Sequence, residues 1–220
     1  MSREKGQEVH SAVQKSQRVV YLLPDKMGGL LNIVAHLLEH RRPDAFEHCA
    51  VLVHNPWAGD TRFGGRLAAD RQAAFEHALP NENLCAVLRR LTRLVPPGPG
   101  VLVSNDWIEL AMARYRDPGK AVIQILHGDH DYYYDLATRH EPVIDAYVAY
   151  SRAMYDNLQR LLPRRAESIF HLPYGIPIPP RGRTPAPGPL RLIYSGRLEH
   201  GQKGVFELPE IDRLLGERGV

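Results

Sequence analysis

Short apolar runs alternate with longer amphipathic segments along most of this chain. The runs are rich in Val, Ile, Leu and Tyr, and they are nearly continuous rather than alternating with polar residues, as in parallel strands buried on both faces. They occupy residues 18–23, 49–53, 101–104, 121–126, 146–150 and 168–172. Apolar residues at helical spacing predict helices at residues 30–40, 67–79, 83–94, 109–115 and 152–162. This order predicts an α/β fold, a Rossmann-like parallel sheet with helices on both faces.

A proline-rich stretch divides the chain. Residues 177–189 read PIPPRGRTPAPGP, in which the prolines remove backbone donors and fix φ, so we expect a linker there. Residues 18–176 before it are predicted to form one complete domain. Residues 190–220 after it are predicted to form a strand and a helix, the first βα unit of a second domain whose remainder is absent. We expect residues 1–17, which are polar throughout, to be a disordered tail.

Composition narrows the class of protein. The 220 residues carry a formal net charge of +3, and no Lys/Arg run is interleaved with aromatic residues, so nucleic acid is not an expected partner. The two cysteines, Cys49 and Cys85, are too few for a disulfide framework and are expected to be buried, reduced thiols. No apolar run reaches the roughly 20 residues that span a bilayer, and the polar start lacks a secretory signal. We therefore expect a cytoplasmic protein.

Two glycines follow the first predicted strand. In parallel α/β sheets, ligands bind beyond the carboxyl ends of the strands. Gly28 and Gly29 lie there, ahead of a helix, where they would let the backbone approach a ligand and point N–H groups at an anion. The same pair can also form a plain turn. The pattern is not G-x-G-x-x-G, which weighs against NAD.

The stretch LHGDHDYYYD, residues 126–135, follows the strand at 121–126 and lies on the same predicted rim. Its histidines and carboxylates could hold a metal, act in acid–base chemistry or form a polar loop. A metal needs three or four converging ligands, and nothing elsewhere supplies an obvious partner, so we expect no metal cofactor. We favour hydrogen bonding or acid–base chemistry at His127, which is nearest the strand end.

Basic residues and glycines surround the end of the strand beyond the linker. The segment YSGRLEHGQKGV, residues 194–205, places Arg197 and Lys203 ahead of a helix. A guanidinium and an ammonium arranged across such a turn can bind a diphosphate. The alternative is a solvated basic loop.

Several segments together resemble glycosyltransferase family 4, the retaining enzymes of GT-B fold. LRLIYSGRLEHGQKGV resembles the segment of that family that binds the donor phosphates, and PYGIPIP resembles the end of its first domain. AYVAYSRAMYDNL, ILHG and MGGLLNIV resemble further units in the order of the family. The resemblance covers most of the chain.

This resemblance implies a transferase that moves a sugar from a nucleotide-sugar, which is a substrate rather than a cofactor. His127 would lie near the reacting sugar as the catalytic residue, and Arg197 and Lys203 would neutralise the donor diphosphate. It implies donor contacts at Gly28, Gly29, Gly196, Arg197, Lys203 and Gly204, and acceptor contacts at Asp129, His130 and Tyr132. The acceptor would be a saccharide or a lipid-linked molecule used in polysaccharide biosynthesis, which allows peripheral association with the inner face of the membrane.

The chain departs from the family in one respect. The family's second domain carries a glutamate-containing motif that holds the donor, and no residue after Val220 can supply it. We therefore expect this chain alone to be inactive without the missing C-terminal domain. Two alternatives remain open, a non-catalytic Rossmann-like module that binds a nucleotide or sugar, and a metal-dependent hydrolase that uses His127, Asp129 and His130.

Overall fold

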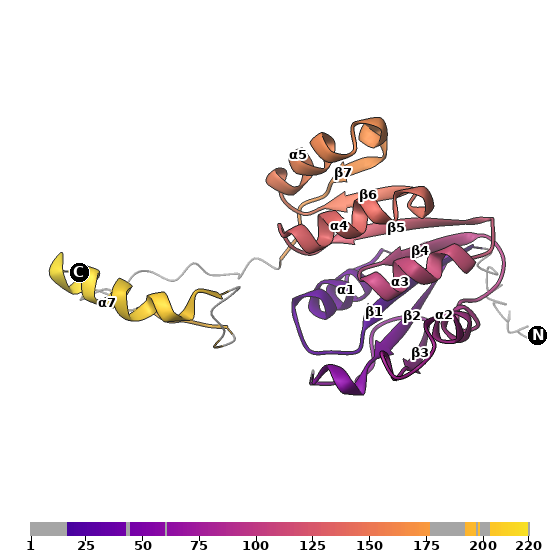
Figure 1. Cartoon of the computed structure of the whole chain (residues 1–220), viewed down its shortest axis with the longest axis horizontal. Helices are drawn as coiled ribbons and strands as arrows, with labels where there is room; N and C mark the ends of the chain where they lie inside the picture. Colours follow the sequence, from indigo (N-terminus) through magenta and orange to yellow (C-terminus); the bar gives the residue numbers. More distant parts are fainter. Residues whose placement is uncertain are drawn as a thin grey trace, which may run out of the picture. The chain divides into compact units, whose positions relative to one another are not determined.

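Seven parallel strands form one sheet. The computed structural model describes residues 17–42, 45–59, 61–176, 192–196, 198 and 203–219. The sheet order is β3-β2-β1-β4-β5-β6-β7, and every neighbouring pair is parallel (Figure 1). The strands are β1 (Gln17–Pro24), β2 (Phe46–His54), β3 (Arg71–Glu76), β4 (Gly100–Ser104), β5 (Lys120–Leu126), β6 (Ala146–Ala149) and β7 (Ile169–His171).

Helices cover both faces of this sheet. They are α1 (Gly29–Glu39), α2 (Leu84–Thr92), α3 (Trp107–Met112), α4 (Asp131–Arg139) and α5 (Arg152–Leu161). The buried residues of α1 pack with Leu23, Ala50 and Leu52 on one face. Those of α2 to α5 pack in a second cluster with Val20, Leu22 and Leu102 on the other face. Right-handed crossovers give this division, because the chain runs from β1 towards β3 in one direction and from β4 towards β7 in the other. The predicted Rossmann-like α/β fold is confirmed.

One predicted helix is wrong. Residues 67–79 were expected to be helical, whereas Arg71–Glu76 form β3, which pairs with β2 along its whole length. The alanines give this segment helical spacing, but β2 is buried over most of its length and needs backbone partners on both sides, whereas the mostly exposed β3 can leave its outer N–H and C=O groups to water. The requirement for backbone pairing outweighs the local preference. Helix α4, by contrast, begins inside the stretch 126–135, where no helix was predicted.

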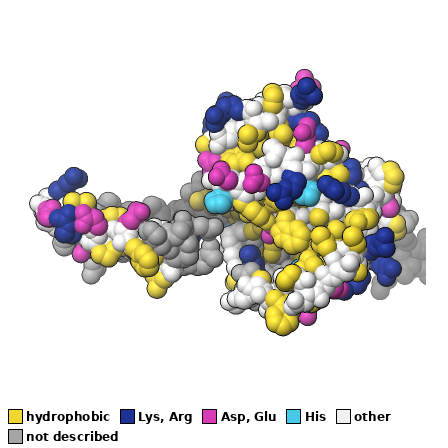
Figure 2. Space-filling view, viewed as in Figure 1, with side chains coloured by type: hydrophobic (Ala, Val, Ile, Leu, Met, Phe, Trp, Pro, Cys, Tyr) yellow, Lys and Arg dark blue, Asp and Glu magenta, His cyan; other side chains and the backbone are white. Residues whose placement is uncertain are grey.

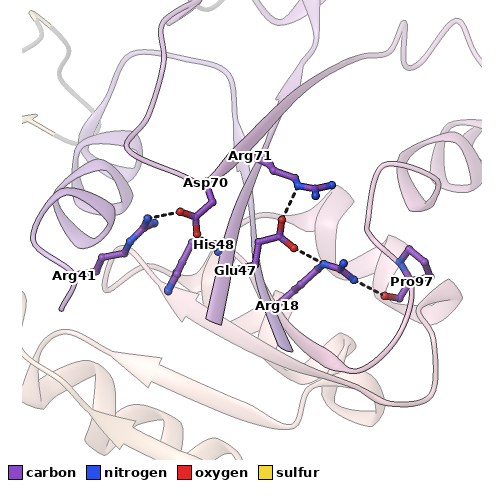
Figure 3. A network of polar contacts seen from close by, with 7 residues as sticks. All are labelled: Arg18, Arg41, Glu47, His48, Asp70, Arg71 and Pro97. Carbon is purple, nitrogen blue, oxygen red and sulfur yellow. Dashed lines mark hydrogen bonds and ion pairs between the residues drawn. The ribbon is translucent and has the colours of Figure 1, made fainter. Parts of the chain in front are cut away.

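Charged residues join the amino ends of β1, β2 and β3. Glu47 accepts from the Nε atoms of Arg18 and Arg71, each at 2.6 Å (Figure 3). Asp70 accepts from Nη2 of Arg41 at 2.9 Å and from the backbone N–H of His48 at 2.8 Å. These contacts fix the register of three neighbouring strands at the edge opposite their carboxyl ends.

The chain divides into two compact units, residues 1–175 (unit 1) and 176–220 (unit 2). Unit 2 contains the short helix η5 (Val205–Glu207) and α7 (Leu208–Glu217). The strand predicted at residues 190–195 is not found at 192–195, where Leu192 and Ile193 are 66% and 91% exposed. A strand needs a neighbour for its backbone hydrogen bonds, and the described residues of unit 2 contain no other strand.

The tail and the linker stay predictions, whereas the expectation for the cysteines is wrong in part. Residues 1–16 of the predicted tail and the linker at 177–189 lie outside the described residues, and Gln17 already belongs to β1. Both cysteines are free thiols, but only Cys49 is buried. Cys85 is exposed, because it lies on the solvent side of α2, whose buried residues are Val87, Leu88 and Leu91.

Candidate functional site

A pocket of about 230 Å³ lies at the carboxyl edge of the sheet. The strands that follow β1 in the chain lie on one side of it up to β3 and on its other side from β4 onwards. Ligands of such sheets bind at this switch point, between β1 and β4. Side chains from the ends of four strands and from the start of α4 surround the pocket. The polar lining residues are Asp25, Lys26, His54, Asn55, His77, Asp106, Glu109 and Tyr132, with Trp107 beside them.

Asn105 connects this pocket to His127. It follows β4, is 1% exposed, and donates from Nδ2 to the carbonyl of Leu22 in β1 at 2.6 Å. Because its amide nitrogen is used in this way, its Oδ1 must act as the acceptor in the contact with Nε2 of His127, also 2.6 Å. His127 therefore carries its proton on Nε2.

His127 is a neutral imidazole. Burial lowers its pKa to about 4, so it is uncharged at neutral pH. Its ring lies between those of Tyr133 and Tyr150, with centroids 6.4 and 5.7 Å away. Nδ1 of His127 and the hydroxyl of Tyr150 are both buried and have no hydrogen-bond partner among the described residues. Unsatisfied buried polar atoms are rare and call for a functional explanation. Nδ1 can accept a proton or hydrogen bond, but His127 cannot serve as a charged donor near pH 7.

Glu109 forms part of the pocket wall as a buried carboxyl group. It is fully buried, and its Oε2 accepts from the backbone N–H of Asn105 and, at 3.0 Å, from that of Asp106. Burial and, secondarily, the charge of Asp106 raise the pKa of Glu109 well above its usual value. Its carboxyl group holds the turn after β4 in place, and its raised pKa disfavours the charged form.

Asp106 joins α3 to α4 across the rim. It is the N-cap of α3, where it accepts from the backbone N–H of Trp107 at 2.7 Å and shares a capping box with Glu109. It also accepts from the hydroxyl of Tyr132 on α4. Burial, together with this hydrogen bond, raises the pKa of Tyr132, so the phenol stays protonated. These side-chain contacts connect the start of α3, which follows β4, to α4, which follows β5.

The loop after β1 is anchored by Asp25, which is 2% exposed. It accepts from Nε of Arg62 at 2.7 Å and from the backbone N–H of Gly64 at 3.1 Å. Gly28 and Gly29 follow this anchor, and Gly28 is the N-cap of α1. A Cβ at either glycine would meet nothing within 4 Å. There is therefore open space at both glycines, beside the pocket. Their backbone conformation would also allow a residue that has a side chain.

The other predicted acceptor residues lie further out. His130 is the N-cap of α4 and accepts at Nδ1 from the backbone N–H of Tyr132 at 3.1 Å. Asp129 accepts from the hydroxyl of Tyr134 and from Nδ2 of Asn157, the latter at 3.2 Å. Of the three predicted acceptor residues, only Tyr132 lines the pocket.

Apart from Gly28 and Gly29, which belong to unit 1, the predicted donor residues lie in unit 2. Gly204 adopts a left-handed conformation (φ 57°) at the start of η5, and Lys203 before it is exposed. Gly196 is described, whereas Arg197 lies outside the described residues. The two units are separate bodies, so the donor assignments stay predictions.

Sequence reasoning missed the residues that shape the pocket, namely Asp25, Asn105, Asp106 and Glu109. One signal was available, because SNDWIE at residues 104–109 follows an apolar run and contains D-x-x-E, the pattern of a capping box. That pattern would have placed a helix start at the strand end. It would not have shown that Asn105 reaches β1 and β5.

Exposed aromatic and apolar side chains gather near this edge. Met27, Trp57, Trp107 and Tyr132 follow the ends of four different strands and are each more than a third exposed. In the space-filling view, hydrophobic side chains also cover a broad area over the lower part of unit 1 (Figure 2). Trp107 is the one of the two tryptophans that lines the pocket.

The described residues contain neither a cluster of metal ligands nor a helix that could span a membrane. No three His, Cys, Asp or Glu side chains among them are close enough together to hold a metal ion. None of the helices that can be described is both long and apolar enough to cross a membrane.

Comparison with known proteins gives a structural likeness only. No family model matches the chain, and no curated protein matches it. Among solved structures, it is similar to a crystal structure of UDP-N-acetylglucosamine 2-epimerase, at 13% identity and a TM-score of 0.46. The match covers 70% of this chain and 47% of the other, so the chain spans about half the length of that protein. The resemblance to glycosyltransferase family 4 thus stays an interpretation of the motifs.

Proposed function

We propose that this chain is the acceptor-side part of a glycosyltransferase, together with the start of its donor-binding part. The enzyme would move a sugar from a nucleotide-sugar to a saccharide, a lipid-linked molecule or another acceptor, with retention of configuration. The observation that carries the proposal is the pocket at the switch point of the sheet, which adjoins the neutral His127 through Asn105. Its size suits one sugar unit, and it offers hydrogen-bonding side chains next to an exposed tryptophan.

The protonation states in unit 1 fit such a reaction. When the bond between sugar and diphosphate breaks, negative charge grows on the leaving diphosphate, and cations are needed there rather than beside the acceptor. In the proposal, Arg197 and Lys203 supply these cations. His127 accepts a hydrogen bond from a sugar hydroxyl at Nδ1, once the side chains that bury this atom move. Closure of the two domains would exclude water, which is why the chain alone is expected to be inactive.

A non-catalytic sugar- or nucleotide-binding module is the second candidate. The observation that favours it is that burial lowers the pKa of His127 and raises that of Glu109, which disfavours the charged form of both side chains. A metal-dependent hydrolase has no comparable support, because the described residues contain no group of three metal ligands.

The first test is binding in the pocket. Saturation-transfer NMR with methyl glycosides of neutral hexoses should show binding that is lost in Trp107→Ala. Trp57→Ala is the matched control, because Trp57 is 68% exposed after β2 but does not line the pocket. Equal binding by both variants would contradict the assignment of the pocket.

The second test separates the two candidates. UDP- and GDP-sugars are titrated by calorimetry, and sugar transfer to the glycosides that bind is assayed in this chain and in any longer form of the protein. Transfer by a longer form, lost in His127→Ala, supports the transferase. Binding without transfer in every form supports the module, and transfer by the 220-residue chain would refute the expectation that it is inactive.

A further inference from the structure

A second cavity, of about 290 Å³, lies at the opposite edge of the sheet. Its lining includes Thr92 and Arg93 at the end of α2, Pro97 before β4, Arg116 and Asp117 after α3, and Lys120, the first residue of β5. The first pocket lies beyond the carboxyl ends of the strands. A seven-residue strand such as β5 separates the two edges by about 20 Å. The second cavity is therefore independent of the proposed function.

Lys120 places a buried positive charge in this cavity. The residue is 3% exposed, and its Nζ donates to the carbonyl of Gly98. It forms no ion pair with the described residues. The carboxylate of Asp117 accepts from the backbone N–H of Gly98 at 2.8 Å, and its charge only partly offsets the lowering of the Lys120 pKa by burial. An ammonium group has three hydrogens to donate. A buried charge without an opposite partner is unfavourable, so the site favours an anion.

Two guanidinium groups add to this charge. Arg116 is held in place by bonds from Nε to the carbonyl of Lys120 at 2.8 Å and from Nη1 to that of Ala113 at 3.1 Å. Its Nη2 forms an ion pair with the half-exposed Asp145 at 3.7 Å, which is too long for a hydrogen bond, so the hydrogens on Nη2 stay available to a ligand. Arg93 is exposed; its backbone N–H bonds to the carbonyl of Arg90, but its guanidinium forms no hydrogen bond or ion pair with the described residues. Both can therefore contribute donors to a ligand.

The neighbouring Arg18 does not belong to this set. Its Nη1 donates to the carbonyl of Pro97 at 3.1 Å, but its Nε is paired with Glu47 at 2.6 Å (Figure 3). Its charge is thus already balanced within the sheet edge. The cavity itself is lined by three cations and one carboxylate.

We propose that this cavity binds a small oxyanion, a phosphate ion or the phosphate group of a small monoester. Lys120, Arg116 and Arg93 would donate charge-assisted hydrogen bonds to its oxygens. A purely structural role for the cations explains the bonds of Lys120 and Arg116 to backbone carbonyls. It does not explain why Arg93 lines the cavity without a partner, or why no carboxylate pairs with Lys120.

Thermal unfolding with added anions tests the site. Inorganic phosphate and glucose 6-phosphate should raise the melting temperature of the 220-residue chain above that in chloride of equal ionic strength. Titration should give a saturable dissociation constant. Arg93→Ala should weaken phosphate binding about tenfold, the loss expected for one charge-assisted contact. Because Arg93 is exposed, this variant should fold, whereas Lys120→Met tests the buried charge only if it folds.

Arg89→Ala is the matched control, since Arg89 lies on the same helix and does not line the cavity. Phosphate binding unchanged in Arg89→Ala and weakened in Arg93→Ala supports the site. Equal weakening in both variants would show a general effect of net charge and would overturn the proposal. The absence of any phosphate-specific rise in melting temperature would overturn it as well.

Discussion

Replacing Asn105 with aspartate should turn His127 from a neutral into a charged imidazole near neutral pH. In the wild-type protein, Oδ1 of Asn105 is 2.6 Å from Nε2 of His127, and burial holds the pKa of His127 at about 4. Asn105→Asp keeps this geometry and places a carboxylate against the same N–H group. An opposite charge at this distance favours the protonated imidazole.

The expected size of the change follows from Coulomb's law. Two unit charges roughly 4 Å apart, at an effective dielectric constant of about 20, attract each other by about 4 kcal/mol. This corresponds to about 3 pKa units, so the pKa of His127 should rise to about 7. The substitution also removes the donor to the carbonyl of Leu22, and an unpaired buried group costs about 1–3 kcal/mol.

Long-range ¹H–¹⁵N NMR of the histidine side chains measures both the tautomer and the pKa. Between pH 5 and 9, wild-type His127 should show one unchanging signal pattern, that of the Nε2–H tautomer. Asn105→Asp should titrate within this range. Asn157→Asp is the control, because Asn157 lies outside the pocket and bonds to Asp129 and Tyr134. It should leave the His127 signal unchanged.

The wild-type result alone can refute the reasoning. A pKa of His127 near its ordinary value, or a dominant Nδ1–H tautomer, would show that Asn105 does not set the state of this ring. The same pKa also predicts acid sensitivity. On acidification, His127 takes up a proton near pH 6.5 in the unfolded chain but only near pH 4 in the folded chain. The free energy of unfolding should therefore fall as the pH drops from about 6.5 to about 4.

Three further predictions concern stability, measured by urea unfolding. Glu109→Gln should raise the free energy of unfolding at pH 7, because the pKa of the buried carboxyl is raised in the folded chain, whereas the carboxyl of the unfolded chain is ionised at that pH. The gain should shrink towards pH 4.5, and a gain that does not depend on pH would contradict this reasoning. Arg62→Ala should lower the free energy of unfolding by about 1–3 kcal/mol, because the buried Asp25 loses one hydrogen-bonded partner while it keeps the backbone N–H of Gly64. A similar loss in the exposed control Arg66→Ala would count against that reason. Leu102→Ala, in the fully buried centre of β4, should lower the free energy of unfolding by about 2–5 kcal/mol, while no loss would mean that β4 is not central to the core.

The sequence by itself determined the class of fold. Nearly continuous apolar runs such as 121–126 can be satisfied only by burial on both faces, and this property is local to each strand. The sequence also placed His127 at a strand end, because the polar residue that follows a buried run must lie at the edge of the sheet. These features need no knowledge of which strands are neighbours.

The tertiary structure decided the rest. Residues 71–76 became a strand because the edge of β2 needs backbone partners, which no local pattern reveals. Asn105 is bonded to Leu22, 83 positions away, and to His127, 22 positions away, so its role exists only once β1, β4 and β5 are side by side. The raised pKa of Glu109 likewise follows from complete burial by the folded chain. Side-chain chemistry at this site depends on neighbours that the order of the strands selects, and that order is a property of the whole sheet.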